Sequence, residues 1–260
     1  MSAVLKDKAD APLRGAPAGK VQSFETPLLR RMEIAEDTMA FYFARPPEFG
    51  FRAGQAVTLT LANPPETDAK GDRRTFSIAS APYESELMVA SRMRDTAFKR
   101  TLRTVALGTT VRLRGPTGSF TLPAGERRPL VMLAGGIGIT PFVSMLREDA
   151  VDGPGRPIYL FYSNRTPGSA AFLPELTWLA SANSRFRLVA TMTDPQTPGE
   201  PWPGTRGFIS AEMLTATLGD LLEAAYYVAG PPPMVAAMLD LLARMRVPTE
   251  RIRTDEFFGY

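Results

Sequence analysis

The chain has 260 residues, 44% of them apolar, and a formal net charge of +3. This length most often makes two domains of ordinary size, and the charge is too small to indicate a nucleic-acid partner. The chain contains no cysteine and no histidine, which excludes a disulfide, a thiolate nucleophile, an iron–sulfur cluster of its own and serine–histidine catalysis. Difficult chemistry must therefore come from a bound organic cofactor, and no metal site is predicted.

The amino terminus is predicted to be a flexible tail. Residues 1–20 are rich in Ala, Pro, Gly and Lys and contain no apolar run of the kind found in a signal peptide. No stretch of the chain approaches the roughly twenty apolar residues of a membrane helix. These patterns predict a cytoplasmic protein without membrane insertion.

Residues 21–125 carry a β pattern. Short apolar runs alternate with Pro and Gly at a spacing of about ten to fifteen residues, which is typical of a small antiparallel barrel. One interruption, TAFKRTLRTV at 96–105, predicts a short helix with Thr96 as its N-cap. The expected strands are FETPLLRRMEI, MAFYFARP, QAVTLTLANPP, TFSIASAP, ELMVASRM and TVRLRGPTGSF.

Residues 126–260 change to an alternation of strands and helices. Fully apolar strands such as PLVMLAGG and AAYYVAGP are separated by helical segments such as ITPFVSMLREDA. This alternation predicts a parallel sheet covered by helices on both faces. The chain is therefore expected to hold a barrel domain at 21–125 and an α/β domain at 126–260.

Two glycine-rich turns follow strands in the second part. LAGGIGITPF at 133–142 opens a helix with Pro141 in its first turn, where a missing N–H donor is tolerated. YYVAGPPPMV at 226–235 repeats the arrangement after a later strand. Such turns offer backbone N–H groups and a helix N-terminus to a pyrophosphate, so they predict one nucleotide crevice lined from two strand ends.

Five motifs in chain order make residues 21–260 resemble the ferredoxin–NADP reductase superfamily. The family's flavin motif R-x-(Y/F)-S matches Arg74-Thr75-Phe76-Ser77, and GPTGSF at 115–120 fits the element that ends its barrel. Its G-G-x-G-x-(T/A)-P motif matches residues 135–141, and its C-G-P-x-x-M motif matches Ala229-Gly230-Pro231 with Met234. The acidic-aromatic C-terminus runs from Glu256 to Tyr260. The resemblance implies FAD on the barrel and NADPH or NADH on the α/β domain.

The resemblance assigns roles around the flavin. Arg74 would pair with the pyrophosphate, which suits a planar guanidinium, and Phe76 would pack on the flavin beside Thr75 of the same motif. Many relatives have Tyr where this chain has Phe76, so a hydroxyl contact is missing and FAD is expected to be held less tightly. Ser77 would place its hydroxyl near the flavin N5 atom and assist hydride arrival.

The C-terminus would complete the catalytic set, which is Ser77, Glu256 and Phe258. Phe258 would shield the flavin face that the nicotinamide reaches, with Tyr260 as the rival aromatic. Glu256 resembles the family's acid near the flavin and would relay a proton.

The chain departs from the family pattern at two places. Where many relatives have a G-x-x-S phosphate loop, this chain has Thr96-Ala97-Phe98-Lys99, so Thr96, Lys99 and the helix N-terminus would serve the phosphates, with Arg92 as a second contact. Ala229 replaces the family's cysteine near the nicotinamide, so hydride transfer is expected to be slower.

The choice of coenzyme depends on the residues after the second α/β strand. Ser163-Asn164-Arg165-Thr166 offers hydroxyls and a cation, with no acid until Glu175, which favours the 2′-phosphate of NADPH over NADH. The predicted NAD(P) site comprises Gly135, Gly136, Ile137, Gly138, Thr140, Pro141, Ser163, Arg165, Ala229, Gly230, Pro231 and Met234.

The leading interpretation is an FAD-dependent oxidoreductase that takes hydride from NAD(P)H. Because the chain has no cysteine, electrons would pass to a separate ferredoxin, flavodoxin or oxygenase component. The alternative is a flavin reductase that uses free flavin as a substrate, since such relatives share an R-x-F-S-I-A-S motif. A non-catalytic nucleotide-binding subunit is the third interpretation, and it predicts no NAD(P)H oxidation with any acceptor.

Overall fold

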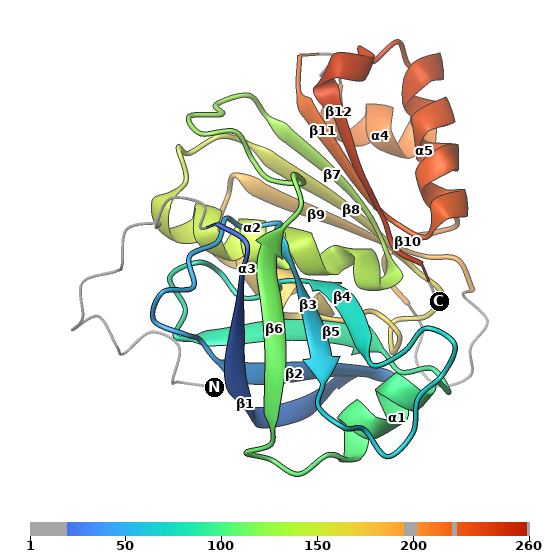
Figure 1. The fold of residues 1–260 in the computed structure, drawn as a ribbon. Helices are drawn as coiled ribbons and strands as arrows, with labels where there is room; N and C mark the ends of the chain where they lie inside the picture. Colours follow the sequence, from blue (N-terminus) through green and yellow to red (C-terminus); the bar gives the residue numbers. More distant parts are fainter. Residues whose placement is uncertain (1–19, 195–201, 220–222, 259–260) are drawn as a thin grey trace.

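The computed structural model describes residues 20–194, 202–219 and 223–258. The predicted tail at 1–20 lies outside these ranges apart from its last residue. An antiparallel half lies below a parallel half in the view of Figure 1. This arrangement confirms the predicted fold class, a β-barrel followed by a parallel α/β sheet.

Six antiparallel strands form the amino-terminal half, in the order β4-β3-β6-β1-β2-β5. A bridge between Ile78 and Val89 joins the two ends of this sheet and closes the barrel. In β6, Val111 and Leu113 are buried while Arg112 between them is exposed, as expected for a strand with one face on a core. The strands are β1 (Gln22–Ala35), β2 (Thr38–Ala44), β3 (Ala56–Leu61), β4 (Arg73–Ser77), β5 (Glu86–Arg92) and β6 (Thr110–Thr117).

The helix α1 (Ala97–Thr104) lies between β5 and β6. Thr96 is its N-cap, as predicted, and its side-chain oxygen accepts a hydrogen bond from the Lys99 backbone N–H at 3.3 Å. Phe98 and Leu102 bury the apolar face of α1 in the barrel core, and the Phe98 ring centroid is 6.1 Å from that of Phe76. The helix is therefore packed directly beside the flavin motif on β4.

Six parallel strands form the second half, in the order β10-β9-β8-β7-β11-β12. The chain runs outward from β7 to β10 and then returns to place β11 and β12 on the other side of β7. The point where the order reverses, at the carboxyl ends of β7 and β11, is where such sheets bind ligands. The strands are β7 (Leu130–Gly135), β8 (Ile158–Asn164), β9 (Phe186–Met192), β10 (Thr205–Arg206), β11 (Ala225–Gly230) and β12 (Ile252–Glu256). The helices are α2 (Thr140–Asp152), α3 (Leu173–Ala182), α4 (Ala211–Leu218) and α5 (Pro232–Arg244), with short 3₁₀ turns η1 (Gly136–Ile139) and η2 (Thr249–Arg251).

Both faces of the parallel sheet are covered, as predicted. Alternate residues of β7 show this: Met132 and Ala134 lie in the core shared with α2 and α3, and Val131 and Leu133 in the core shared with α4 and α5. Within the described ranges, no helix is long and apolar enough to cross a membrane.

The core on the α2 side continues into the barrel. Ala40, Ala53, Ala79 and Ala90 of the barrel belong to the same buried cluster as Phe142 of α2. The barrel side of this interface therefore combines these small side chains with the larger Met88 and Phe120. The predicted division near residue 125 falls between β6 and β7, and as a domain boundary it stays a prediction.

Candidate cofactor-binding site

The arginine of the flavin motif, Arg74, is held in place by neighbouring backbone carbonyls and one carboxylate. Arg74 Nη2 donates to both carboxylate oxygens of Asp68, at 2.8 and 2.9 Å. Its Nη1 donates to three backbone carbonyls within 70–73. The guanidinium is thus fixed at the edge of the barrel, and a phosphate would have to replace part of this set.

The remaining motif residues have different surroundings. Phe76 points into the barrel core and is 9% exposed. Ser77 is also buried and pairs in register with Ala56, which lines a cavity of about 410 Å³. The Thr75 hydroxyl lies 2.9 Å from the Thr58 hydroxyl on the neighbouring strand. A role for Phe76 against the flavin ring stays a prediction.

Basic side chains gather at the start of α1. Lys99 Nζ donates to the Arg92 carbonyl at 2.7 Å. Burial, and then repulsion from Arg94, Arg74 and Lys70, lowers the pKa of Lys99 to about 8. An amine whose pKa is lowered in this way is stabilised in its charged form by a nearby anion, so this group suits a phosphate.

The second predicted phosphate contact, Arg92, faces the α/β half. Its Nη2 donates to the Ser169 carbonyl at 3.2 Å, whereas its Nε is buried and has no hydrogen-bond partner among the described residues. A buried guanidinium N–H without an acceptor is destabilising, and a ligand oxygen would satisfy it. The residues around α1 therefore fit a phosphorylated cofactor.

The two glycine-rich turns touch each other. A Cβ added at Gly138 would lie 2.5 Å from the Ala229 carbonyl oxygen and 2.7 Å from Gly230 Cα. A Cβ added at Gly135 would lie 2.1 Å from Met234 Sδ. The structure thus brings the two predicted motifs together at the point where the strand order reverses. At Gly135 and Gly138 only glycine, which has no side chain, fits between them.

The side chains of these turns mostly serve the fold. Thr140 Oγ1 donates to the Ile137 carbonyl at 3.0 Å, and both residues are buried. Pro141 lies in the first turn of α2, and Pro231 is the N-cap of α5. Nucleotide binding at this crevice is therefore predicted to depend on backbone N–H groups rather than on these side chains.

Ser163 and Arg165 lie at the carboxyl end of β8, as predicted. Asp194, which sequence reasoning missed, lies beside them: its carboxylate is 3.8 Å from Arg165 Nη2, and its N–H donates to the Arg165 carbonyl at 2.9 Å. Glu175, the nearest acid in the sequence, instead pairs with Arg147. Parallel pairing of β8 with β9 creates this proximity, which no short-range pattern signals.

The C-terminal segment is anchored at the second glycine turn. The Phe257 N–H donates to the Gly230 carbonyl at 3.0 Å, and the next side chain, Phe258, is 77% exposed. Glu256 is exposed, and the rival aromatic Tyr260 lies outside the described residues. An exposed ring beside the crevice suits the predicted shielding role of Phe258.

The cavity of about 410 Å³ lies between the barrel and β12. Asp255 lines it, and burial raises the pKa of this carboxyl to about 6. Sequence reasoning chose the neighbouring Glu256, because which of these two residues lines the cavity depends on how β12 lies against the barrel, and no short-range pattern signals that. The cavity is lined by Gly54, Ala56, Gly118, Ser119, Phe120, Arg253, Thr254 and Asp255.

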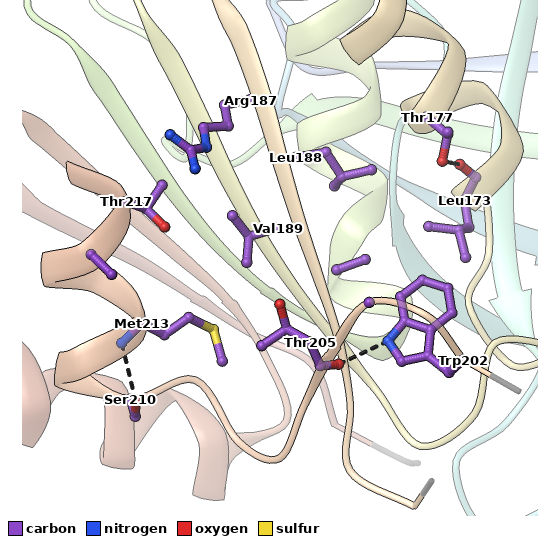
Figure 2. Close-up of a pocket in the computed structure, with 13 residues that line it drawn as sticks. Leu173, Thr177, Arg187, Leu188, Val189, Trp202, Thr205, Ser210, Met213 and Thr217 are labelled. Atoms are coloured by element: carbon purple, nitrogen blue, oxygen red, sulfur yellow. Dashed lines mark hydrogen bonds between the residues drawn. The ribbon is translucent and has the colours of Figure 1, made fainter.

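A larger cavity, of about 690 Å³, runs along β9 between α3 and α4 (Figure 2). Leu188 and Val189 of β9 and Met213 of α4 contribute apolar side chains to it. None of the predicted site residues lines this cavity, so we assign it no cofactor. Among the described residues, no three acidic side chains are grouped as a metal ion would require.

Comparison with known proteins supports the same family. The family model of the oxidoreductase NAD-binding domain matches residues 132–240. The reductase component of propane 2-monooxygenase from Rhodococcus jostii is 30% identical over 266 residues, which cover 98% of this chain and 68% of that protein. The glycine betaine monooxygenase reductase subunit of Chromohalobacter salexigens is 31% identical over 209 residues, covering 79% of this chain and 55% of that protein.

Solved structures show the same fold. The ferredoxin NADP⁺ reductase of Neisseria gonorrhoeae, with bound FAD and NADP, superposes with a TM-score of 0.76 at 24% identity and covers 92% of this chain and all of that one. With the barrel, the parallel sheet and the paired glycine turns in place, the chain belongs to the ferredoxin–NADP reductase superfamily of NAD(P)H-dependent reductases.

Proposed function

We propose that this chain is the reductase component of an oxygenase system, taking hydride from NAD(P)H and passing electrons to a separate oxygenase component. One observation carries the proposal: residues from both halves converge at one junction. Ala56, paired with Ser77, and Asp255 line the same cavity, and the segment after Asp255 is bonded to Gly230 of the paired glycine turns.

The barrel residues would hold the flavin. Lys99, Arg74 and Arg92 would bind its phosphates, and Ser77 would orient the reactive edge of the ring. The bound flavin supplies hydride acceptance and electron release, which no side chain of this chain provides. Phe258 would cover the exposed face until the nicotinamide arrives.

Two acids are candidates for holding a proton near the junction. Glu256 is exposed, whereas Asp255 lines the cavity and has a pKa raised to about 6 by burial. Because burial raises its pKa to about 6 and it lines the cavity, Asp255 is the better candidate for proton exchange at this junction.

These 260 residues contain no cysteine that could ligate an iron–sulfur cluster, which supports an acceptor outside them. The names of the two oxygenase reductases quoted above favour an oxygenase component over a free ferredoxin or flavodoxin. A cytoplasmic location stays a prediction from the sequence.

The choice between NADPH and NADH is also a proposal, because two neighbouring side chains favour different coenzymes. Arg165 favours the 2′-phosphate of NADPH, whereas Asp194 beside it favours the ribose hydroxyls of NADH. We retain NADPH as the favoured coenzyme, because Arg165 is the more exposed of the two, with 76% of its side chain accessible against 50% for Asp194.

The test is an anaerobic titration of the purified protein with NADPH and, separately, with NADH. We expect a yellow protein whose flavin absorbance bleaches with either nucleotide, faster with NADPH, and which then reduces a one-electron acceptor without added flavin. Purified oxygenase components from related systems would then be offered as electron acceptors.

Two outcomes would contradict the proposal. A colourless protein that oxidises NAD(P)H only when flavin is added would support the flavin reductase instead. A protein that oxidises neither nucleotide with any acceptor would support the non-catalytic subunit.

A further inference from the structure

The flavin strand and the nucleotide helix are joined by a direct hydrogen bond. Three residues after Ser77, the Ser80 carbonyl accepts a hydrogen bond from Ser144 Oγ of α2 at 2.6 Å. Ser80 is 1% exposed and Ser144 is fully buried. Because α2 begins at the glycine turn, this bond ties one predicted half-site to the other.

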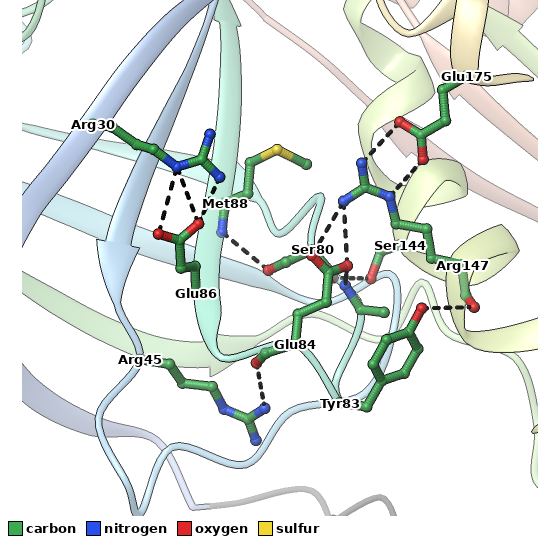
Figure 3. A network of polar contacts seen from close by, with 11 residues as sticks. Arg30, Arg45, Ser80, Tyr83, Glu84, Glu86, Met88, Ser144, Arg147 and Glu175 are labelled. Atoms are coloured by element: carbon green, nitrogen blue, oxygen red, sulfur yellow. Dashed lines mark hydrogen bonds and ion pairs between the residues drawn. The ribbon is translucent and has the colours of Figure 1, made fainter. Parts of the chain in front are cut away.

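An ion pair one helical turn further along α2 crosses the same boundary. Arg147 Nη1 donates to both carboxylate oxygens of Glu84, at 3.2 and 3.4 Å. Its Nε and Nη2 donate to Glu175 of α3 at 2.7 and 2.8 Å. Figure 3 shows the guanidinium between the two carboxylates, one from each half of the molecule.

The loop that carries Glu84 is itself held to the barrel. Arg45 donates to the carbonyls of Pro82 and Glu84, and the Ala81 N–H donates to Glu84 Oε1 at 2.6 Å. The Ser80 hydroxyl accepts from the Met88 N–H at 3.0 Å. The loop that carries Glu84 is therefore fixed to the barrel, so the ion pair with Arg147 connects α2 to the barrel itself.

Other contacts cross the same boundary. The Glu36 N–H donates to the Gly168 carbonyl at 2.8 Å, and the ring centroid of Phe120 lies 5.6 Å from that of Phe142 on α2. Next to α2, the short side chains of Ala40, Ala53, Ala79 and Ala90 interdigitate little, so directional polar bonds add to the orientation that the other contacts set.

We propose that Ser80, Glu84, Ser144 and Arg147 form an interdomain clasp that positions the nicotinamide half-site against the flavin half-site for hydride transfer. These are positioning residues, because none of them lines the cavity at the junction. The proposal rests on the hydride transfer proposed above. A small misplacement of reacting atoms slows such a step strongly, so the clasp acts on rate rather than on binding.

The chain offers a matched pair of variants. Glu84→Gln removes the carboxylate charge that crosses between the halves but keeps a carbonyl oxygen for the Ala81 N–H. Glu175→Gln removes a carboxylate charge from the same guanidinium, but within the α/β half alone. Ser144→Ala removes the hydrogen bond to Ser80 independently of charge.

We expect Glu84→Gln and Ser144→Ala to lower the rate of flavin reduction at saturating NAD(P)H about tenfold. Glu175→Gln should stay within about twofold of the wild type, and FAD content and NAD(P)⁺ affinity should be unchanged in all three. Hydrogen–deuterium exchange on protein without nucleotide gives a second readout: Glu84→Gln should speed exchange in 79–88, and Glu175→Gln should not.

Equal rates in Glu84→Gln and the wild type, or equal slowing in Glu84→Gln and Glu175→Gln, would overturn the clasp. A wild-type protein that fails to transfer hydride would refute the proposed function instead. In that case the exchange comparison still decides whether the clasp holds the two halves together.

Discussion

At the scale of single residues, Lys99 carries the most specific chemical signal. Its pKa is lowered to about 8 by burial and by neighbouring cations, and a bound phosphate would raise it again. Binding above pH 8 then requires proton uptake, so FAD affinity should fall roughly tenfold between pH 7 and pH 9.5. Fluorescence titration across this range measures the effect. Lys99→Gln should flatten the profile, and Arg103→Gln, an exposed charge on the same helix, should not. A steep profile in Lys99→Gln would show that another group binds the phosphate.

At the scale of elements, the two glycine turns behave as one unit. Alanine at Gly138 would force its Cβ into the backbone of β11, with Ala229 O at 2.5 Å. We expect Gly138→Ala to lower the free energy of unfolding by about 1–3 kcal/mol and to weaken NAD(P)H binding at least tenfold. Chemical unfolding and nucleotide titration measure the two effects. Gly108→Ala is the control. The φ of +86° at Gly108 makes an alanine there destabilising, but no atom lies within 4 Å of the added Cβ. Unchanged nucleotide affinity in Gly138→Ala would show that this turn is not part of the nucleotide-binding site.

At the scale of the whole molecule, Asp255 couples pH to the packing of the two halves. Its pKa is raised by burial from 3.8 to about 6, so the folded protein holds this proton more tightly than the unfolded chain. The contribution of this tightly held proton to the free energy of unfolding is complete below about pH 4 and is lost as the pH rises through 6. Asp255→Asn should therefore be more stable than the wild type at pH 7, by about 1 kcal/mol after allowing for solvent screening, and similar at pH 4. Urea unfolding at both pH values tests this prediction, and Glu256→Gln, at an exposed neighbouring residue, is the control variant. A larger gain at pH 4 than at pH 7 would reverse the assigned sign.

The sequence by itself determined the elements and their order. Periodicity of apolar residues and Pro/Gly punctuation act between near neighbours, so they located the barrel strands, the Thr96 cap and the alternating second half. The motifs, which are also local, indicated a flavin half-site and a nucleotide half-site. None of these patterns depends on the register between distant segments.

The tertiary structure alone decided which side chains meet. Pairing of β8 with β9 placed Asp194 beside Arg165, and the orientation of β12 turned Asp255 rather than Glu256 toward the cavity. The contact between Ser80 and Ser144 joins residues 64 positions apart. Such contacts follow from strand register and interface packing, which sum many weak interactions across the whole chain, so no short-range pattern encodes them.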